Sequence, residues 1–270
     1  MTMAADPDSG ARLRSLYARD GGARSIFSAK VADYLASRPD YPAALFDKLA
    51  RSGLPAPATI ADVGAGTGLL TGDLLRRGHR VVAVEPNPEM RQAADHLLGG
   101  VDGYRSVEGC AESIPLGDAS VDLITAAQAF HWFDVDRARA EFLRVLTPAG
   151  QVALIWNDRI LEDPLHLALD AVFSRFGGEK RSALLAHEDR ANVPRFFGAG
   201  RSQEHSWPHA HRLDEAGLMS LVFSRSYMPA GGSPPGREAA GQVRAIFARQ
   251  AAGGVVEVRY RTVLHLGRPA

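Results

Sequence analysis

Two carboxylates and three glycines stand together in the first half of the chain, in a spacing that suits a nucleoside-bearing ligand. The run Ile60–Gly68 reads IADVGAGTG, and the apolar run that follows a short helical pattern ends in Glu85. Glycine lets a backbone turn sharply and approach a ligand closely, because it has no Cβ. An acid at the end of the second strand is placed to accept hydrogen bonds from both hydroxyls of a ribose. We therefore expect a cofactor site at this turn.

The spacing of the glycines separates two cofactors. A dinucleotide fingerprint runs GxGxxG, but here the third glycine falls one residue early, at Gly68, and Leu69 stands in its place. Asp62 lies just before the first glycine, and an acid there suits a cationic ammonium and sulfonium better than phosphates. The pattern favours S-adenosylmethionine. One alternative is NAD, which would make the protein an NAD-dependent oxidoreductase. A second alternative is that the glycines only form a tight turn and bind no ligand.

Four segments follow one another along the chain: Ala61–Gly68, Val84–Met90, Ala111–Leu116 with Val121–Ile124, and Ala127–Phe133. In this order they resemble the successive motifs of class I S-adenosylmethionine-dependent methyltransferases. They are similar to the small-molecule branch of that family, which includes the trans-aconitate-methyltransferase-like enzymes. The resemblance begins near Phe27, thins between about residues 159 and 206, and returns at Ser224–Tyr227 and Val256–Thr262. It implies a fold and a cofactor and does not identify the methyl acceptor.

The resemblance also implies which residues contact S-adenosylmethionine. Asp62 would attend the ammonium group, Glu85 the ribose, and Pro86 with Met90 the faces of the adenine. For Met90, an ordinary core position is an equal alternative. Many relatives carry an acid or a threonine where this chain has Cys110, and a thiol is a weaker hydrogen-bond partner. The full expected set is Tyr34, Arg38, Asp62, Gly64, Ala65, Gly66, Gly68, Glu85, Pro86, Met90, Ala111, Glu112 and Gln128.

Tyr34 and Arg38 are separated by four residues and would share one face of a helix. The fork of an arginine side chain suits a carboxylate. We therefore expect this face to close over the carboxylate of the methionine moiety. A surface salt bridge is the alternative for Arg38.

Three further residues are expected to carry the chemistry, because they follow the fourth strand of the family pattern. Gln128, His131 and Trp132 should form the floor of the methyl-transfer pocket. An imidazole titrates near neutral pH, so His131 could take a proton from a hydroxyl or amine acceptor. Packing beside Trp132 is an equal alternative. Methyl transfer is an in-line displacement, so positioning of the reactants matters more than a strong base.

Strands and helices alternate between residues 59 and 156. We predict strands at 59–63, 80–85, 104–108, 121–126 and 151–156, and helices at 68–77, 88–98 and 136–146. Such alternation is typical of βαβ crossovers and a parallel sheet covered by helices on both faces. With the resemblance, the expected fold is α/β, Rossmann-like and doubly wound: a mostly parallel seven-stranded sheet with an antiparallel last strand.

The chain divides into four expected parts. Residues 1–23 read as a flexible polar tail, and residues 24–158 as N-terminal helices with the cofactor-binding core. Residues 159–200 read as a helical cap over the substrate, although an ordinary packed connection is the alternative. Residues 201–270 would supply closing strands, with helices at 214–224 and 236–252 joined by a flexible loop at 231–236.

The amino-acid composition limits the kinds of partner that the protein can bind. Lys and Arg together number 31, as do Asp and Glu, so the chain lacks the basic excess that polyanion binding needs and we expect no nucleic-acid partner. Cys110 is the single cysteine, which permits a reducing compartment, and we expect a cytoplasmic location. No apolar stretch approaches a membrane span, and three late histidines, His205, His209 and His211, do not complete a metal site of known spacing. We expect a monomer or homodimer acting on a small-molecule methyl acceptor, with a non-catalytic cofactor-binding module as a last alternative.

Overall fold

A single mixed sheet organises the molecule. The computed structural model describes residues 15–16, 30–31, 33, 37–187 and 190–270. Within them, the strand order across the sheet is β3-β2-β1-β4-β5-β7-β6. β7 runs antiparallel to both of its neighbours, while the pairs among β1 to β5 are parallel. The strands are β1 Thr59–Val63, β2 Arg80–Val84, β3 Tyr104–Val107, β4 Val121–Ala127, β5 Leu146–Arg159, β6 Ser202–Leu213 and β7 Val256–Gly267. The predicted fold class is confirmed.

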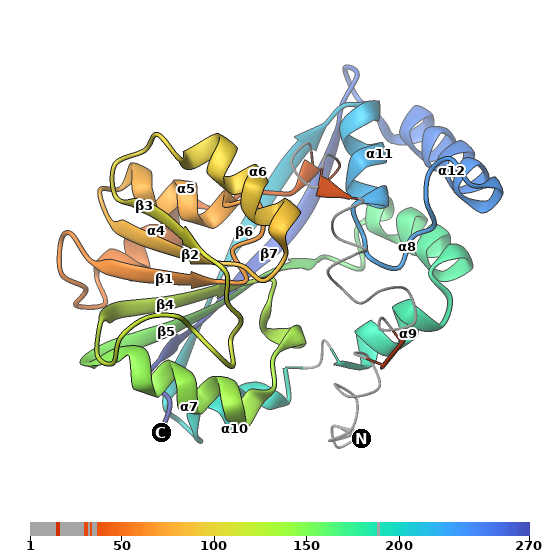
Figure 1. Ribbon diagram of the computed structural model, residues 1–270. Helices are drawn as coiled ribbons and strands as arrows, with labels where there is room; N and C mark the ends of the chain where they lie inside the picture. The colour runs from red at the N-terminus through yellow and green to blue at the C-terminus, as the bar shows by residue number, and fades with distance from the viewer. Residues whose placement is uncertain (1–14, 17–29, 32, 34–36, 188–189) are drawn as a thin grey trace.

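Helices cover both faces of the parallel part of the sheet (Figure 1). One face carries α4 Ala43–Ala50, α5 Leu69–Arg76 and α6 Pro88–Leu98, and the other carries α7 Val135–Val145 and α10 Asn192–Phe197. The central strands are buried on both faces, and β4 accordingly reads as a nearly continuous apolar run. Phe142 of α7 and Phe196 of α10 are fully buried and meet edge to face at 5.6 Å between ring centroids. α7 and α10 therefore share one hydrophobic core with this face of the sheet.

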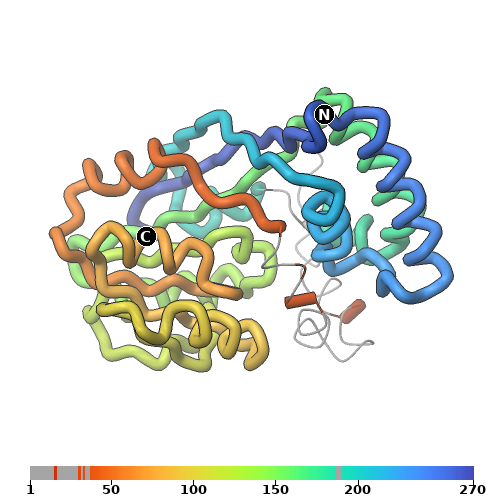
Figure 2. Tube along the Cα trace, turned by 90° about the horizontal axis from the view of Figure 1, so that it is seen from above, coloured from red at the N-terminus to blue at the C-terminus, as the bar shows by residue number. Residues whose placement is uncertain are grey.

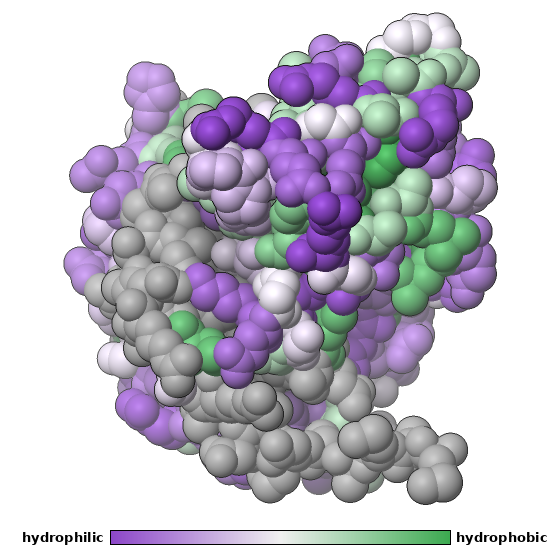
Figure 3. All heavy atoms as spheres, turned by 90° about the vertical axis from the view of Figure 1, so that its right-hand side faces the viewer, coloured by the Kyte–Doolittle hydropathy of each residue, from purple (hydrophilic) through white to green (hydrophobic). Residues whose placement is uncertain are grey.

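A second helical layer lies beside the sheet rather than on it. It comprises α8 Pro164–Phe176, α9 Gly178–His187, α11 Glu215–Phe223 and α12 Pro234–Gln250, and we call these helices the cap. Their apolar side chains share one core with residues at the far ends of β6 and β7. Figure 2 shows the two bodies side by side, with the long strands β5, β6 and β7 passing between them. On the outward side of the cap, hydrophobic and hydrophilic side chains are intermingled (Figure 3).

Two local expectations were wrong. β5 begins at Leu146, not at residue 151. Within the segment 159–200, which was expected to be helical, residues 192–197 form α10, whose Val193 and Phe197 pack in the core beside α7. The loop expected to reach residue 236 ends earlier, because Ser233 caps α12 through its hydroxyl and Pro234 stands in the first turn, where a missing N–H costs nothing.

The cap contains helices from both sides of the boundary that we expected between residues 200 and 201. α8 and α9 precede this boundary, and α11 and α12 follow it. In the described part of the chain, no helix has the length and apolar character needed to cross a membrane.

Candidate active site

A cavity of about 530 Å³ opens at the carboxyl ends of the parallel strands, between the sheet and the cap. One side of it, which we call the glycine end, is formed at the turns after β1, β2 and β3. Its residues are Asp62, residues 64–67, Leu69, Leu70, residues 85–87, Met90 and residues 110–112. The other side, the arginine end, is formed by Arg38, residues 156–159, Arg190, Leu221, residues 225–227 and Tyr260. The residues after β4, which include Gln128, His131 and Trp132, also line the cavity.

The turn after β1 requires glycine. Gly64 has a φ of 71°, and a Cβ at this position would lie 2.7 Å from the Cβ of Ala129. Gly68 begins α5 with a φ of 82°, and its Cβ would lie 2.7 Å from Leu98. Both residues adopt a left-handed conformation that a side chain disfavours. The turn is therefore built for close packing against the segments that surround the cavity.

Asp62 lies beneath this turn and is almost fully buried. Its two carboxylate oxygens accept hydrogen bonds from the hydroxyls of Thr71, at 2.7 Å, and Thr125, at 2.8 Å. Burial raises the pKa of the Asp62 carboxyl. The side chain therefore joins β1, β4 and α5 below the cavity that it also lines. A contact of Asp62 with a ligand ammonium stays a prediction.

Glu85 ends β2 and faces the glycine turn. Its carboxylate accepts hydrogen bonds from the backbone N–H groups of Gly66 and Asn87, each at 2.8 Å. Burial raises the pKa of this carboxyl as well. Among the described residues, no ion pair neutralises Asp62 or Glu85. Glu85 suits the ribose hydroxyls of either cofactor. Asp62 disfavours a pyrophosphate and suits a ligand that carries a positive charge.

Met90, Ala111 and Cys110 line the same end of the cavity. Met90 and Ala111 are both buried. Met90 is therefore a core residue and a cavity-lining residue at the same time, so the two predictions for it are compatible. Burial raises the pKa of the half-buried Cys110 thiol, which keeps it protonated and weakly polar. Glu112 accepts a hydrogen bond from the backbone N–H of Asp134 at 2.6 Å, so its carboxylate also secures the start of α7.

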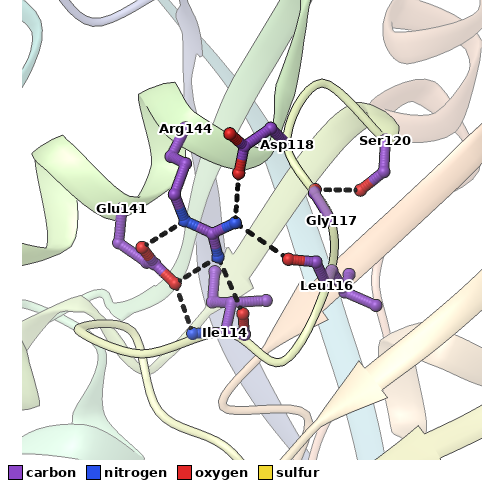
Figure 4. A network of polar contacts seen from close by, with 7 residues as sticks. All are labelled: Ile114, Leu116, Gly117, Asp118, Ser120, Glu141 and Arg144. Carbon is purple, nitrogen blue, oxygen red and sulfur yellow. Dashed lines mark hydrogen bonds and ion pairs between the residues drawn. The ribbon is translucent and has the colours of Figure 1, made fainter.

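Arg144 of α7 holds the loop that continues from these residues (Figure 4). Its guanidinium donates to the carbonyls of Ile114 and Leu116, each at 2.9 Å, and pairs with Asp118 at 2.7 Å. Glu141 pairs with Arg144 at 2.7 Å and accepts from the backbone N–H of Ile114. The network ties the loop after β3 to α7 at several points.

Gln128, His131 and Trp132 all line the cavity. Gln128 has a φ of 55°, which is uncommon outside glycine and is often found at functional sites. Its backbone N–H donates to the Ile155 carbonyl at 2.9 Å, and its side-chain amide donates to the Asn157 carbonyl at 3.3 Å. His131 and Trp132 belong to a short 3-10 helix, and their ring centroids lie 5.0 Å apart.

Most of the predicted site comes together in this cavity. Tyr34 lies outside the described residues, and Gly68 supports the turn without lining the cavity. The remaining predicted residues all line it. Sequence reasoning missed the arginine end, including Arg159, Arg225 and Tyr260. The last two lie in the segments where the resemblance returns after residue 206, but nothing in those segments indicated a role.

Comparisons with known proteins agree with the geometry. Residues 61–154 match the family model described as a methyltransferase domain. An uncharacterized methyltransferase of Mycobacterium tuberculosis is 39% identical over 202 residues, 74% of this chain and 76% of the relative. An uncharacterized methyltransferase-like protein of Schizosaccharomyces pombe is 39% identical over 204 residues, which are 75% of this chain and 78% of the relative. A solved structure from Anaeromyxobacter dehalogenans, a candidate type II methyltransferase, is 28% identical with a TM-score of 0.58, covering 86% of this chain and 99% of its own.

These matches decide against the oxidoreductase alternative and against a module without enzymatic activity. The glycine turn, the acid that ends β2 and the strand order agree with them. The cofactor is S-adenosylmethionine, and the chain belongs to the class I S-adenosylmethionine-dependent methyltransferases.

Proposed function

We propose that the enzyme transfers the methyl group to an oxygen or nitrogen atom of a small-molecule metabolite that enters the arginine end of the cavity. The observation that carries this proposal is the continuity of the cavity, which is lined by the glycine turn, by Gln128 to Trp132 and by residues of the cap. A ligand in such a space is enclosed on several sides, as small-molecule sites usually are. The neutral net charge of the chain also argues against a polyanionic acceptor.

In this proposal the residues of the glycine end hold most of the cofactor, and Arg38 of the arginine end reaches its carboxylate. Glu85 would accept hydrogen bonds from the ribose hydroxyls, and Asp62 would attend the ammonium group. Pro86, Met90, Ala111 and Glu112 border the adenine. When bound, S-adenosylmethionine supplies an electrophilic methyl group on a sulfonium. Tyr34 would assist Arg38.

Gln128, His131 and Trp132 would orient the acceptor. The fixed backbone of Gln128 and the ring pair of His131 and Trp132 give this part of the cavity a defined shape. Holding two reactants in an attack geometry can supply about 7 to 11 kcal/mol of a reaction barrier. His131 would in addition accept the proton of a hydroxyl or amine acceptor.

Two measurements test the proposal. Calorimetry with S-adenosylhomocysteine tests the cofactor site, with Gly64→Val as the defective control because its side chain would meet Ala129. Incubation with methyl-labelled S-adenosylmethionine and a cell extract, followed by separation by mass, tests the acceptor class. We expect label in the low-mass fraction with the native protein and none with Gly64→Val. Label confined to protein or nucleic acid would contradict a small-molecule acceptor.

A further inference from the structure

A polar bridge built on Asn157 connects the end of β5 to the backbone near Arg38. The pairing of β4 with β5 ends at Ala127 and Ile155, so Asn157 lies beyond the last pair, in the lining of the cavity. β7 continues to pair with β5 at this point and sets Thr262 directly opposite Asn157. Residues in opposite positions of antiparallel strands lie close enough for their side chains to interact.

Both polar atoms of the Asn157 side chain have partners. The Thr262 hydroxyl donates to Oδ1 of Asn157 at 2.6 Å, and Nδ2 of Asn157 donates to the backbone carbonyl of Asp40 at 3.1 Å. Asn157 is 9% exposed, and Thr262 is fully buried. A carbonyl can only accept, so the amide nitrogen must face Asp40 and the amide oxygen must face Thr262. A buried network that is satisfied in this way holds its members in one arrangement.

The backbone around Asp40 depends on such contacts. Residues 38–42 belong to neither a helix nor a strand, so no regular ladder of hydrogen bonds sets their path. Pro39 and Pro42 restrict φ within the stretch and make it stiff. A stiff stretch that is held at the Asp40 carbonyl places Arg38, two residues earlier, at a defined point in the lining of the cavity.

A second contact holds Asp40 from another strand. Its Oδ1 lies 2.9 Å from Nε2 of His209, which belongs to β6. The His209 side chain is only 12% exposed, so its imidazole is held firmly by the surrounding structure. Asp40 is therefore attached to β5 through its carbonyl and to β6 through its carboxylate, and the stretch that carries Arg38 cannot tilt freely away from the sheet.

We propose that Asn157, oriented by Thr262, is a positioning residue that holds Arg38 in place for the carboxylate of S-adenosylmethionine. The inference rests on the proposed function, in which Arg38 binds that carboxylate. A guanidinium makes two parallel hydrogen bonds to a carboxylate only in an accurate geometry. Such accuracy requires support from residues behind the one that touches the ligand. Asn157 supplies this support through the backbone of Asp40.

Calorimetry on the full chain tests the proposal with two ligands that differ by one carboxylate, S-adenosylhomocysteine and its decarboxylated form. The native protein should prefer S-adenosylhomocysteine. Asn157→Leu keeps the branching of the side chain and the backbone carbonyl that Gln128 contacts, but it removes the donor and the acceptor. Its affinity for S-adenosylhomocysteine should fall about 10-fold, as for a weakened hydrogen bond to a charged group. Its affinity for the decarboxylated compound should change little.

Thr262 separates positioning from direct contact, because it lies outside the lining of the cavity. Thr262→Val keeps the shape of the side chain and leaves the Asn157 oxygen without its donor, so the preference for S-adenosylhomocysteine should fall in the same direction. Thr262→Ser keeps the hydroxyl and should retain the preference. Gln151→Leu is the matched control, because the Gln151 amide on the same strand donates to the Ser52 carbonyl at 3.2 Å, outside the cavity lining.

Each outcome has one meaning. If Asn157→Leu and Thr262→Val weaken both ligands equally, or leave the preference unchanged, the two residues only support the fold and the inference is overturned. A native protein that binds both ligands equally would contradict the role of Arg38, and the inference fails with it. If Asn157→Leu does not fold, which its melting temperature shows, the two Thr262 variants decide. The methyl acceptor does not enter these measurements, so an error in the proposed acceptor class is recognised separately, by the labelling experiment.

Discussion

Asp62 and Glu85 are both buried acids, but their oxygens have different partners. The hydroxyls that donate to Asp62 belong to Thr71 and Thr125, which are themselves buried in the core. The groups that donate to Glu85 are backbone N–H groups of turns that line the cavity. Glu85 is therefore the acid whose environment a ribose can enter, whereas Asp62 has a supporting role whatever ligand is bound.

Glu85→Gln should weaken S-adenosylhomocysteine binding and remove part of its pH dependence. Ribose hydroxyls donate to a carboxylate, so binding favours the ionised side chain. Because burial raises the pKa of Glu85 above its ordinary value, affinity for the native protein should fall as the pH drops through that raised pKa. At neutral pH the variant should bind about 10- to 100-fold more weakly, as expected for a lost hydrogen bond to a charged group.

Calorimetry across a pH series measures both effects. Asp62 also has a raised pKa, so the difference between the native protein and the variant isolates the contribution of Glu85. Glu108→Gln is the matched control, since Glu108 is an exposed acid that follows β3 and pairs with Arg91. Equal affinities of Glu85→Gln and the native protein at neutral pH would remove Glu85 from the ribose site.

His131→Ala separates a proton acceptor from a packing residue. If His131 accepts a proton from the acceptor, turnover should fall by about 10² or more, with S-adenosylhomocysteine affinity little changed. His131→Gln keeps a polar side chain of similar length and should be equally slow. If His131 only packs beside Trp132, His131→Gln should restore most of the turnover, which single-turnover assays would reveal.

At the scale of elements, the loop after β3 depends on a side chain of α7. Arg144→Ala removes hydrogen bonds to two backbone carbonyls and leaves Glu141 without its cation (Figure 4). We expect the free energy of unfolding to fall by about 1 to 3 kcal/mol, the usual cost of unpaired polar groups. Because the loop continues from Ala111 and Glu112, S-adenosylhomocysteine affinity should fall too.

Chemical denaturation and calorimetry measure these two effects for Arg144→Ala. Arg137→Ala lies on the same helix at an exposed position and serves as the control. A normal S-adenosylhomocysteine affinity in Arg144→Ala, together with reduced stability, would show that the network supports the fold without positioning the cofactor.

The sequence predicted the elements of the cofactor half well, because buried parallel strands read as apolar runs and glycine marks the turn between β1 and α5. It did not predict the length of β5, whose end at Arg159 depends on pairing with β7 more than 100 residues away. This miss concerns a tertiary contact, which overrides local propensity.

At the scale of the whole molecule, the cavity joins two bodies with separate hydrophobic cores. The glycine end could be predicted because its residues lie within one compact stretch of sequence. The arginine end could not, since Arg159, Arg225 and Tyr260 come from strands β5 and β7 and from the segment after α11. Long-range strand pairing and the packing of the cap bring these residues together. Their spacing along the chain does not indicate that they meet.

Separate cores predict that the two ends of the cavity can be uncoupled by mutation. Leu218 of α11 is fully buried in the core of the cap. Leu218→Ala should cost about 2 to 5 kcal/mol in that core, and hydrogen exchange should accelerate in α8, α11 and α12. The core around β1, β2 and β4 has its own apolar residues. S-adenosylhomocysteine affinity should therefore stay close to native while turnover falls.

Hydrogen exchange with mass spectrometry and calorimetry on Leu218→Ala test this uncoupling. Leu123→Ala, at a fully buried position of β4, is the reciprocal variant: it removes the same side chain from the cofactor half and should weaken S-adenosylhomocysteine binding. If Leu218→Ala weakens this binding as much as Leu123→Ala does, the cap and the sheet unfold as one cooperative unit. β5, β6 and β7 would then transmit strain between the two bodies, because they are the strands that pass from one to the other.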